Sequence, residues 1–159
     1  MAKDGYVYSA TNRGGGGLVK VNVGPGGATA EQVYFDKKLP VAIGGSVLVG
    51  EHLYGTGQVL MCVQFTGGQV KWTDRSVGAG SLLYADGNLY LHGEQTGEMA
   101  LVEATPDGYQ ERGRFTPPGQ PDHGRSKAWA YPVVANGRLY VRDQNVMWCY
   151  DVKDPGAGK

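Results

Sequence analysis

The sequence predicts an all-β protein built from a repeated unit, and three observations support this. About fourteen short segments rich in Val, Leu and Tyr alternate between apolar and polar residues. Of 159 residues, 27 are glycine, which without a collagen period indicates many tight turns. A Leu-Tyr or Val-Tyr pair follows a glycine-containing turn four times, starting at Val7, Leu53, Leu89 and Leu139, at intervals of 46, 36 and 50 residues. A period of about 40–50 residues with about four strands is typical of a β-propeller blade.

The strands and turns follow this period along the chain. Asp86-Gly87 and Asn136-Gly137 are pairs that accept positive φ in tight hairpins, and Gly50 holds the corresponding place in the second unit. We find no apolar set that keeps helical spacing for more than two turns, so no helix is predicted. The expected strands are 6–11, 18–23, 32–35, 46–49, 52–55, 59–65, 69–73, 81–84, 88–92, 99–104, 110–115, 132–135, 138–142 and 146–152.

The repeat divides the chain into four blades of one domain, 1–159. We expect blades at about 4–36, 44–75, 78–116 and 130–153, with an inserted loop at 117–131. The first blade is expected to lack its first strand and the last blade its outer strand. The chain is therefore expected to contain three and a half to four blades. The two incomplete blades cannot complete each other, because three strands plus three strands exceed the four strands of one blade.

One stretch carries the clearest form of the repeat. Val63 to Trp72 reads V-Q-F-T-G-G-Q-V-K-W, and its spacing resembles the tryptophan-docking repeat of pyrroloquinoline-quinone-type (quinoprotein-like) β-propellers. Gln64 stands for the usual Asp and Gly67 for the usual Thr, and 102–104 and 150–153 match the first half of the motif. The resemblance implies a structural role for Trp72, stacked between adjacent blades, with Gly68 in the turn.

The resemblance also bears on completeness, because such propellers usually close seven or eight blades. We therefore expect this chain to be the C-terminal part of a larger propeller, in which the missing strand of the last blade comes from the distant N-terminus. The alternative is a half-propeller that completes its ring with a second copy. Either arrangement would cover the sheet faces and edges that an open stack of blades exposes.

Charge and composition exclude several function classes. Fifteen basic and fifteen acidic residues cancel, which gives no electrostatic footprint for nucleic acid. No apolar run approaches the length of a membrane span, and the first residues lack the apolar core of a secretory signal. Localisation stays unknown, and only the family resemblance favours the periplasm or the cell exterior.

The two cysteines do not form a disulfide framework. Cys62 and Cys149 fall at the same register of the long strand in different units, so we expect two unpaired thiols. Quinone-dependent dehydrogenases of the family typically stack a disulfide of adjacent cysteines on the quinone. This sequence has no adjacent cysteines, so no cofactor is expected, and pyrroloquinoline quinone with calcium enters only under the alternative function below.

The segment Pro117–Pro132 is the longest insertion and the strongest site candidate. It joins an outer strand to the first strand of the next blade, and the resemblance places such joins at the mouth of the central channel. Mixed cationic and aromatic side chains on a loop held by a rigid scaffold are typical of a binding site. The alternative is a surface loop pinned by packing of its tryptophan. The candidate ligand-binding residues are His123, Arg125, Lys127, Trp129 and Tyr131.

Other motifs have structural interpretations. Asn12–Gly17 is glycine-rich but lacks the Gly-Lys-Ser/Thr ending of a phosphate-binding loop, so we expect it, like 23–27, to be a hairpin loop. His52, His92 and His123 lie in different units and predict no metal site. His92 and Glu94 share one strand face, and we expect a surface pair there.

Two functions from different classes remain. The favoured one is a non-catalytic scaffold that binds a protein or a glycan, since the sequence contains no catalytic triad spacing, carboxylate pair or cysteine pair. The alternative is part of a quinone- and calcium-dependent alcohol or sugar dehydrogenase, with oxygens from Asp122, Asp143 and Asn145 and a cation from Arg125 or Lys127. A third class, an acid–base enzyme on a propeller, has no specific support.

Overall fold

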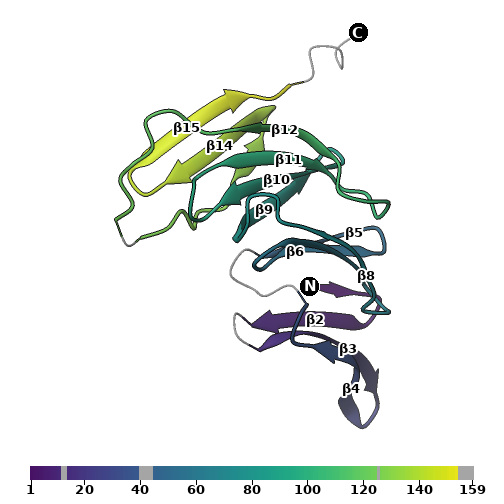
Figure 1. Cartoon of the computed structure of the whole chain (residues 1–159). Coiled ribbons are helices and arrows are strands. Elements are labelled where there is room, and N and C mark those ends of the chain that lie inside the picture. Colours follow the sequence, from purple (N-terminus) through teal and green to yellow (C-terminus); the bar gives the residue numbers. More distant parts are fainter. Residues whose placement is uncertain (12–13, 40–44, 125, 154–159) are drawn as a thin grey trace.

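The computed structural model describes residues 1–11, 14–39, 45–124 and 126–153. These residues form four antiparallel sheets of consecutive strands, three with four strands and one with three (Figure 1). The strands are β1 Ala2–Lys3, β2 Tyr6–Thr11, β3 Gly15–Gly24, β4 Gly27–Asp36, β5 Ser46–Val49, β6 His52–Thr56, β7 Leu60–Gln64, β8 Val70–Asp74, β9 Gly80–Ala85, β10 Asn88–Gly93, β11 Met99–Glu103, β12 Glu111–Phe115, β13 Val133–Ala135, β14 Arg138–Asp143 and β15 Val146–Asp151.

The sheets follow one another along the chain, from β1–β4 at one end of the molecule to β13–β15 at the other (Figure 1). The hairpin turns use the predicted chemistry. Asp4, Asp86 and Asn136 have φ of 52°, 48° and 53°, and each is followed by a glycine that also has positive φ. The all-β prediction is confirmed.

The strand register aligns the four sheets residue by residue. In every sheet, the tyrosine of the second strand pairs with one residue of the third, at Tyr8–Leu18, Tyr54–Cys62, Tyr90–Leu101 and Tyr140–Cys149. A β-bulge follows this third-strand residue in the first three sheets, and it shifts the pairing with the outer strand. The outer-strand residue paired just before the bulge is called the joint position here. It is Tyr34 in β4, Trp72 in β8 and Gly113 in β12.

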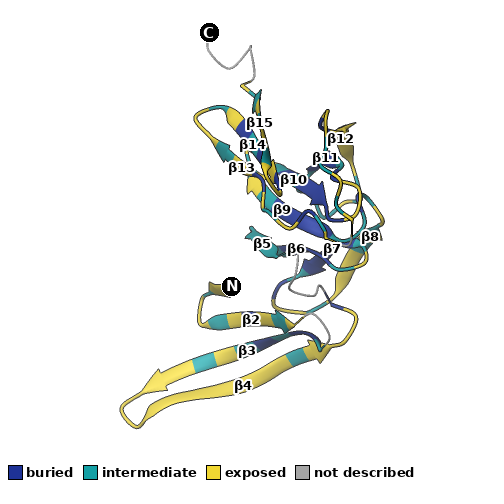
Figure 2. Cartoon of the chain, turned by 90° about the vertical axis from the view of Figure 1, so that its left-hand side faces the viewer, coloured by how far each residue is buried: buried dark blue, intermediate teal, exposed yellow. Residues whose placement is uncertain are grey.

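One expectation for the first sheet is corrected and one is refined. Ala2–Lys3 pairs with β2 and supplies the first strand that the sequence was expected to lack, because a two-residue strand leaves no alternating pattern. The hairpin loop expected at 23–27 is present, but it is shorter than expected, because two ten-residue strands continue up to the pair Gly24 and Gly27. The tip of this β3–β4 hairpin is exposed (Figure 2).

The glycine run of the first sheet is also strand rather than loop from Gly15 onward, and Asn12 and Arg13 lie outside the described residues. A β-carbon at Gly16 would overlap the hydroxyl of Tyr8, and one at Gly15 would overlap the backbone of Asp36. Glycine is therefore required by close packing, which a reading of loop composition does not detect.

The core consists of three apolar layers, one between each pair of neighbouring sheets. Leu53 and Val63 pack against Tyr8 and Leu18 between the first two sheets. Leu89, with Tyr54 and Cys62, belongs to the largest layer, between the second and third sheets. Met99, Leu139 and Val141 form the smallest, between the third and fourth. Burial of these side chains supplies the main favourable contribution to stability.

The outward faces of the two end sheets remain uncovered. Val7 holds the register of Leu53 and Leu89, yet it is 36% exposed whereas both leucines are fully buried. At the other end Cys149 is exposed, while its equivalent Cys62 is buried. Side-chain positions that are buried between neighbouring sheets are thus exposed on the outward faces of the first and fourth sheets (Figure 2). Within the described residues no helix is long and apolar enough to cross a membrane.

Candidate functional site

The insertion 117–132 lies across the ends of the third and fourth sheets and is held there by side-chain contacts. Lys127 Nζ lies 2.6 Å from Glu94 Oε1, and the Ala128 amide donates to the Glu94 carbonyl oxygen at 2.9 Å. Glu94 directly follows β10 and is only 7% exposed. At the start of the insertion, the Trp148 indole of β15 donates to the Pro118 carbonyl oxygen at 2.8 Å.

A second anchor joins the insertion to the end of β14. His123 Nε2 lies 2.6 Å from Oδ2 of Asp143, whose side chain is buried. Among the described residues, the other Asp143 oxygen and the Gln120 side-chain nitrogen are buried without a hydrogen-bond partner. The Gln120 nitrogen and Oδ2 of Asp143 adjoin Gly97, where φ is +62° and a β-carbon would overlap Gln120. This junction is therefore polar, buried and tightly packed.

His92 lies beneath the insertion, and the expectation of a surface pair with Glu94 was wrong. His92 is fully buried, and its Nδ1 lies 3.2 Å from the carbonyl oxygen of Ala130. Thr56, at the same register of β6, donates its hydroxyl to the backbone oxygen of Gly80 in the next sheet. His92 thus repeats a sheet-to-sheet contact. Burial lowers the pKa of His92 below its ordinary value, so the neutral ring is favoured.

The inner side of the insertion is anchored while its aromatic side chains face outward. Ala128 is 1% exposed, but Trp129 is 63% and Tyr131 49% exposed. The ring of Tyr131 approaches Gly45, just before β5, so the segment reaches from the fourth sheet towards the second. Of the five predicted ligand-binding residues, the structure gives anchoring contacts to His123 and Lys127 and an exposed surface to the two aromatics. Arg125 lies outside the described residues.

Trp72 connects the second sheet to the third. Its indole N–H donates to the Thr105 carbonyl oxygen at 2.8 Å, and its ring lies 6.0 Å from Tyr54 and 6.2 Å from Tyr109. The contacts of Trp72 thus involve residues of both sheets.

Sequence reasoning missed that Tyr34 repeats the Trp72 contact one sheet earlier. Its hydroxyl donates to the Phe65 carbonyl oxygen at 2.7 Å, and its ring lies over Gly68. Gly68, the other residue assigned a structural role, has a φ of 69°, and a β-carbon there would lie 2.9 Å from the Tyr34 ring. Burial raises the pKa of Tyr34 to about 12. The signal for Tyr34 in the sequence was its place in the expected strand 32–35, which follows the third strand of the unit.

The cysteines and oxygen ligands considered from sequence lie apart. Cys62 and Cys149 are both unpaired, and burial raises the pKa of the Cys62 thiol. The carboxylate of Asp122 accepts a bond from the Gly124 amide, whereas that of Asp143 binds His123. Within the described part of the chain no group of three or more His, Cys, Asp or Glu side chains is placed to hold a metal ion. In the set Asp122, Asp143 and Asn145, the two carboxylates are thus held by different partners, the Gly124 amide and the His123 ring.

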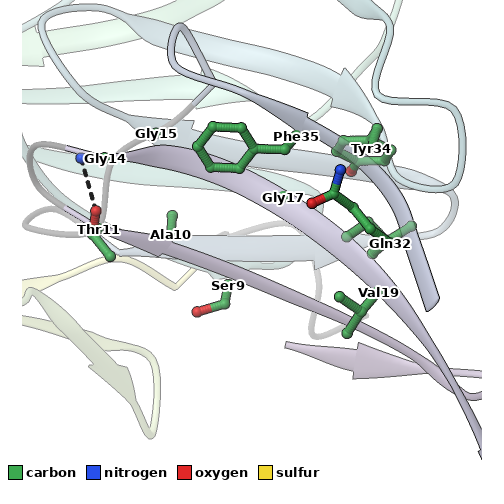
Figure 3. A pocket seen from close by; sticks show the side chains of 11 residues that line it. Ser9, Ala10, Thr11, Gly14, Gly15, Gly17, Val19, Gln32, Tyr34 and Phe35 are labelled. Carbon is green, nitrogen blue, oxygen red and sulfur yellow. Dashed lines mark hydrogen bonds between the residues drawn. The ribbon is translucent and has the colours of Figure 1, made fainter. Parts of the chain in front are cut away.

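Two hollows lie on other surfaces. One, of about 410 Å³, lies over β2, β3 and β4 and is lined in part by Gly14, Gly15 and Gly17 (Figure 3). Ser9 and Thr11 in its wall share the uncovered face of Val7 by strand alternation, so an adjoining sheet would cover this hollow. The second is an open groove of about 550 Å³ along the first strands β1, β5 and β9.

Comparison with solved structures finds a propeller. The crystal structure of BamB from Moraxella catarrhalis matches with a TM-score of 0.65 and 11% sequence identity, covering 94% of this chain and 42% of that chain. The crystal structure of Myxococcus xanthus glutaminyl cyclase matches with a TM-score of 0.43 and 20% identity, covering 92% of this chain and 69% of that chain. No protein-family model and no curated protein matches the sequence.

The match to BamB confirms the predicted fold, part of a β-propeller. The chain spans well under half of the length of that protein. At this low identity the likeness concerns the fold, and function depends on the residues of the site itself.

Proposed function

We propose that this chain is a non-catalytic propeller segment that binds a protein partner through the insertion 117–132. The observation that carries the proposal is the contrast between the two sides of this segment. Its inner side is fixed by Glu94 and Asp143, which lie at the ends of two different sheets. Its outer side presents Trp129 and Tyr131 to solvent.

This contrast is physically suited to binding. Large exposed aromatic side chains are enriched among the residues that dominate binding energy, because they bury much area at small entropic cost. Contacts already made in the unbound state reduce the ordering cost of association. A loop that served only to connect two strands would not need both the Lys127–Glu94 ion pair and the hydrogen bond between His123 and Asp143. The insertion therefore supports a preformed recognition surface.

The uncovered end faces support a further part of the proposal. We propose that additional blades, preceding this chain in a larger protein, or a second copy, cover the faces of Val7 and Cys149. The open edge of β15 would then receive the missing outer strand. A location in the periplasm or outside the cell is proposed from the likeness to BamB and from the family resemblance of the repeat.

Selection from a displayed peptide library would test the proposed binding surface. Peptides selected on the wild-type chain are expected to lose at least about tenfold in affinity for Trp129→Ala and for Tyr131→Ala, as for binding hot spots. Val70→Ala is the matched control, because Val70 is 48% exposed on β8, outside both the insertion and the two end sheets. Equal affinity for all variants would contradict the proposal. A glycan array is run in parallel. Binding to a glycan that depends on Trp129, without any such peptide binding, would contradict a protein partner and indicate a glycan.

The alternative, a part of a quinone- and calcium-dependent dehydrogenase, requires a different experiment. The full-length protein would be titrated with pyrroloquinoline quinone and calcium while quinone absorbance and dye-linked alcohol oxidation are followed. Saturable quinone binding with turnover would overturn the scaffold proposal. Absence of both signals, together with peptide binding that depends on Trp129, is the result expected here.

A further inference from the structure

The joint position between the third and fourth sheets differs from the other two. Trp72 pairs with Cys62 immediately before the bulge of the second sheet, and Gly113 pairs with Leu101 immediately before the bulge of the third. The strand register thus places a glycine where the first two sheets have Tyr34 and Trp72. A β-carbon built on Gly113 would meet no described atom within 4 Å.

The aromatic residues at the other joints perform the same task. Each reaches across to the next sheet and donates one hydrogen bond to a backbone oxygen, at 2.7 Å for Tyr34 to Phe65 and 2.8 Å for Trp72 to Thr105. A planar ring with one donor is therefore the group that this joint geometry accommodates. At Gly113 the chain provides neither the ring nor the donor.

The structure has an apolar cavity of about 180 Å³ at this third joint. Its walls repeat the surroundings of Trp72. Tyr90 holds the register of Tyr54, against which Trp72 packs, and Leu139 holds that of Leu89 in the same layer. The main lining side chains are Tyr90, Met99, Leu101, Phe115, Leu139 and Val152.

Phe115 compensates only in part for the missing aromatic. It lies two residues beyond Gly113, on the same face of β12, and its ring contacts Tyr150 edge-on at a centroid distance of 4.9 Å. Phe115 remains 38% exposed, and the cavity persists beside it. The space left is larger than an engineered apolar cavity of about 150 Å³ that binds benzene.

We propose that this cavity is a binding site for a free planar aromatic molecule that carries one hydrogen-bond donor, of the indole or phenol class. The ring would take the place that Trp72 occupies at the preceding joint. The acceptor would be the backbone oxygen of Val152 or Lys153. These residues correspond to Ala104 and Thr105, since the Ala104 and Val152 amides make the same bond to the turn glycine of their own sheet.

The site is separate from the insertion. The residues that line the cavity lie in the third and fourth sheets of this chain or directly after β15. Of the residues outside the described part, none is aromatic, so none can supply the missing ring. Failure of the binding function proposed for Trp129 and Tyr131 would leave this inference unaffected, and the reverse also holds.

Titration with indole, followed by NMR of methyl groups, tests the proposal directly. Saturable shifts are expected at Met99, Leu101 and Leu139, with a dissociation constant on the order of 1 mM or tighter for so small a ligand. Benzene, which lacks the donor, is expected to bind several-fold more weakly. Absence of saturable shifts at these three methyl-bearing residues would overturn the proposal without any variant.

A substitution that fills the cavity provides a second test of the proposal. Gly113→Trp is expected to abolish the indole-dependent shifts and to raise Tm by about 5 °C, because the ring buries area as Trp72 does. Gly24→Trp is the matched control, since Gly24 also lies in a strand and a β-carbon there meets nothing within 4 Å. It should retain wild-type indole binding. Undiminished indole binding by a folded Gly113→Trp protein would contradict the assignment.

Discussion

The imidazole of His123 donates to the buried carboxylate of Asp143 over 2.6 Å, and this contact fixes the insertion to the end of β14. The two residues are twenty apart in the chain and come from different structural contexts, one from an irregular segment and one from a strand. The pair converts a long connection into part of the rigid body.

Removal of the histidine is expected to destabilise the fold. His123→Ala leaves Asp143 buried and unpaired, which costs about 1–3 kcal/mol of unfolding free energy. Urea unfolding followed by circular dichroism measures this loss. Asp122→Asn serves as control, because Asp122 bonds only the nearby Gly124 amide among its described contacts, and it should change the free energy by less than about 1 kcal/mol. Equal effects of the two substitutions would refute the anchoring role.

The tryptophans should separate into structural and surface classes. Trp72→Leu loses the bond to Thr105 and the contacts with two tyrosines, and we expect a loss of about 2–4 kcal/mol. Trp129→Leu should cost less than about 1 kcal/mol, because the side chain is 63% exposed. Thermal unfolding of both variants is the measurement. A larger loss for Trp129 would support the alternative in which this residue pins the loop.

Gly68 is expected to be intolerant of a side chain for two separable reasons. Gly68→Ala introduces strain at a φ of +69° and places a methyl 2.9 Å from the Tyr34 ring. Gly87→Ala carries comparable strain, at a φ of +78°, but meets no atom within 4 Å. The first should therefore lose more unfolding free energy than the second, which costs about 1 kcal/mol. Chemical denaturation of the pair measures the contribution of the Tyr34 contact alone.

Stability should fall as the pH is lowered through the titration of His92. Burial lowers the pKa of His92 from its ordinary value of 6.5, so the unfolded chain takes up a proton near pH 6.5 before the folded chain does. The loss begins just above pH 6.5 and grows until the lowered folded pKa is reached. His92→Thr, which copies Thr56 at the same register, should remove this part of the pH dependence. Asp143 and His123, which face His92, are present in both proteins and cancel in the difference; superimposable pH profiles would disprove the assignment.

The repeat could be predicted from sequence because its signals are local. Asp86-Gly87 and Asn136-Gly137 adopt the positive φ expected of their turn chemistry, and the paired Leu-Tyr positions align in the strand register. Local signals fail where a strand is too short, as at Ala2–Lys3, or where glycine serves packing rather than a turn, as at Gly16.

The candidate site was only partly predictable, because its contacts join residues that are far apart in the sequence. The insertion and its exposed Trp129 were visible in the sequence, because an unusual length and composition mark a functional loop. The burial of His92 and Glu94 was not, since the residues that cover and contact them lie more than thirty positions later. The absence of an aromatic residue at Gly113 became apparent only when the bulges fixed the register of three outer strands.

Hydrogen exchange in the insertion tests most directly the claim that the recognition surface is preformed. The Ala128 amide donates to Glu94 and the Ser126 amide to His123, so both should exchange at least about a hundredfold more slowly than in an unfolded chain. Exchange of both amides at unfolded rates, with β10 and β14 still protected, would show that the segment is not held by the sheets and would contradict the account.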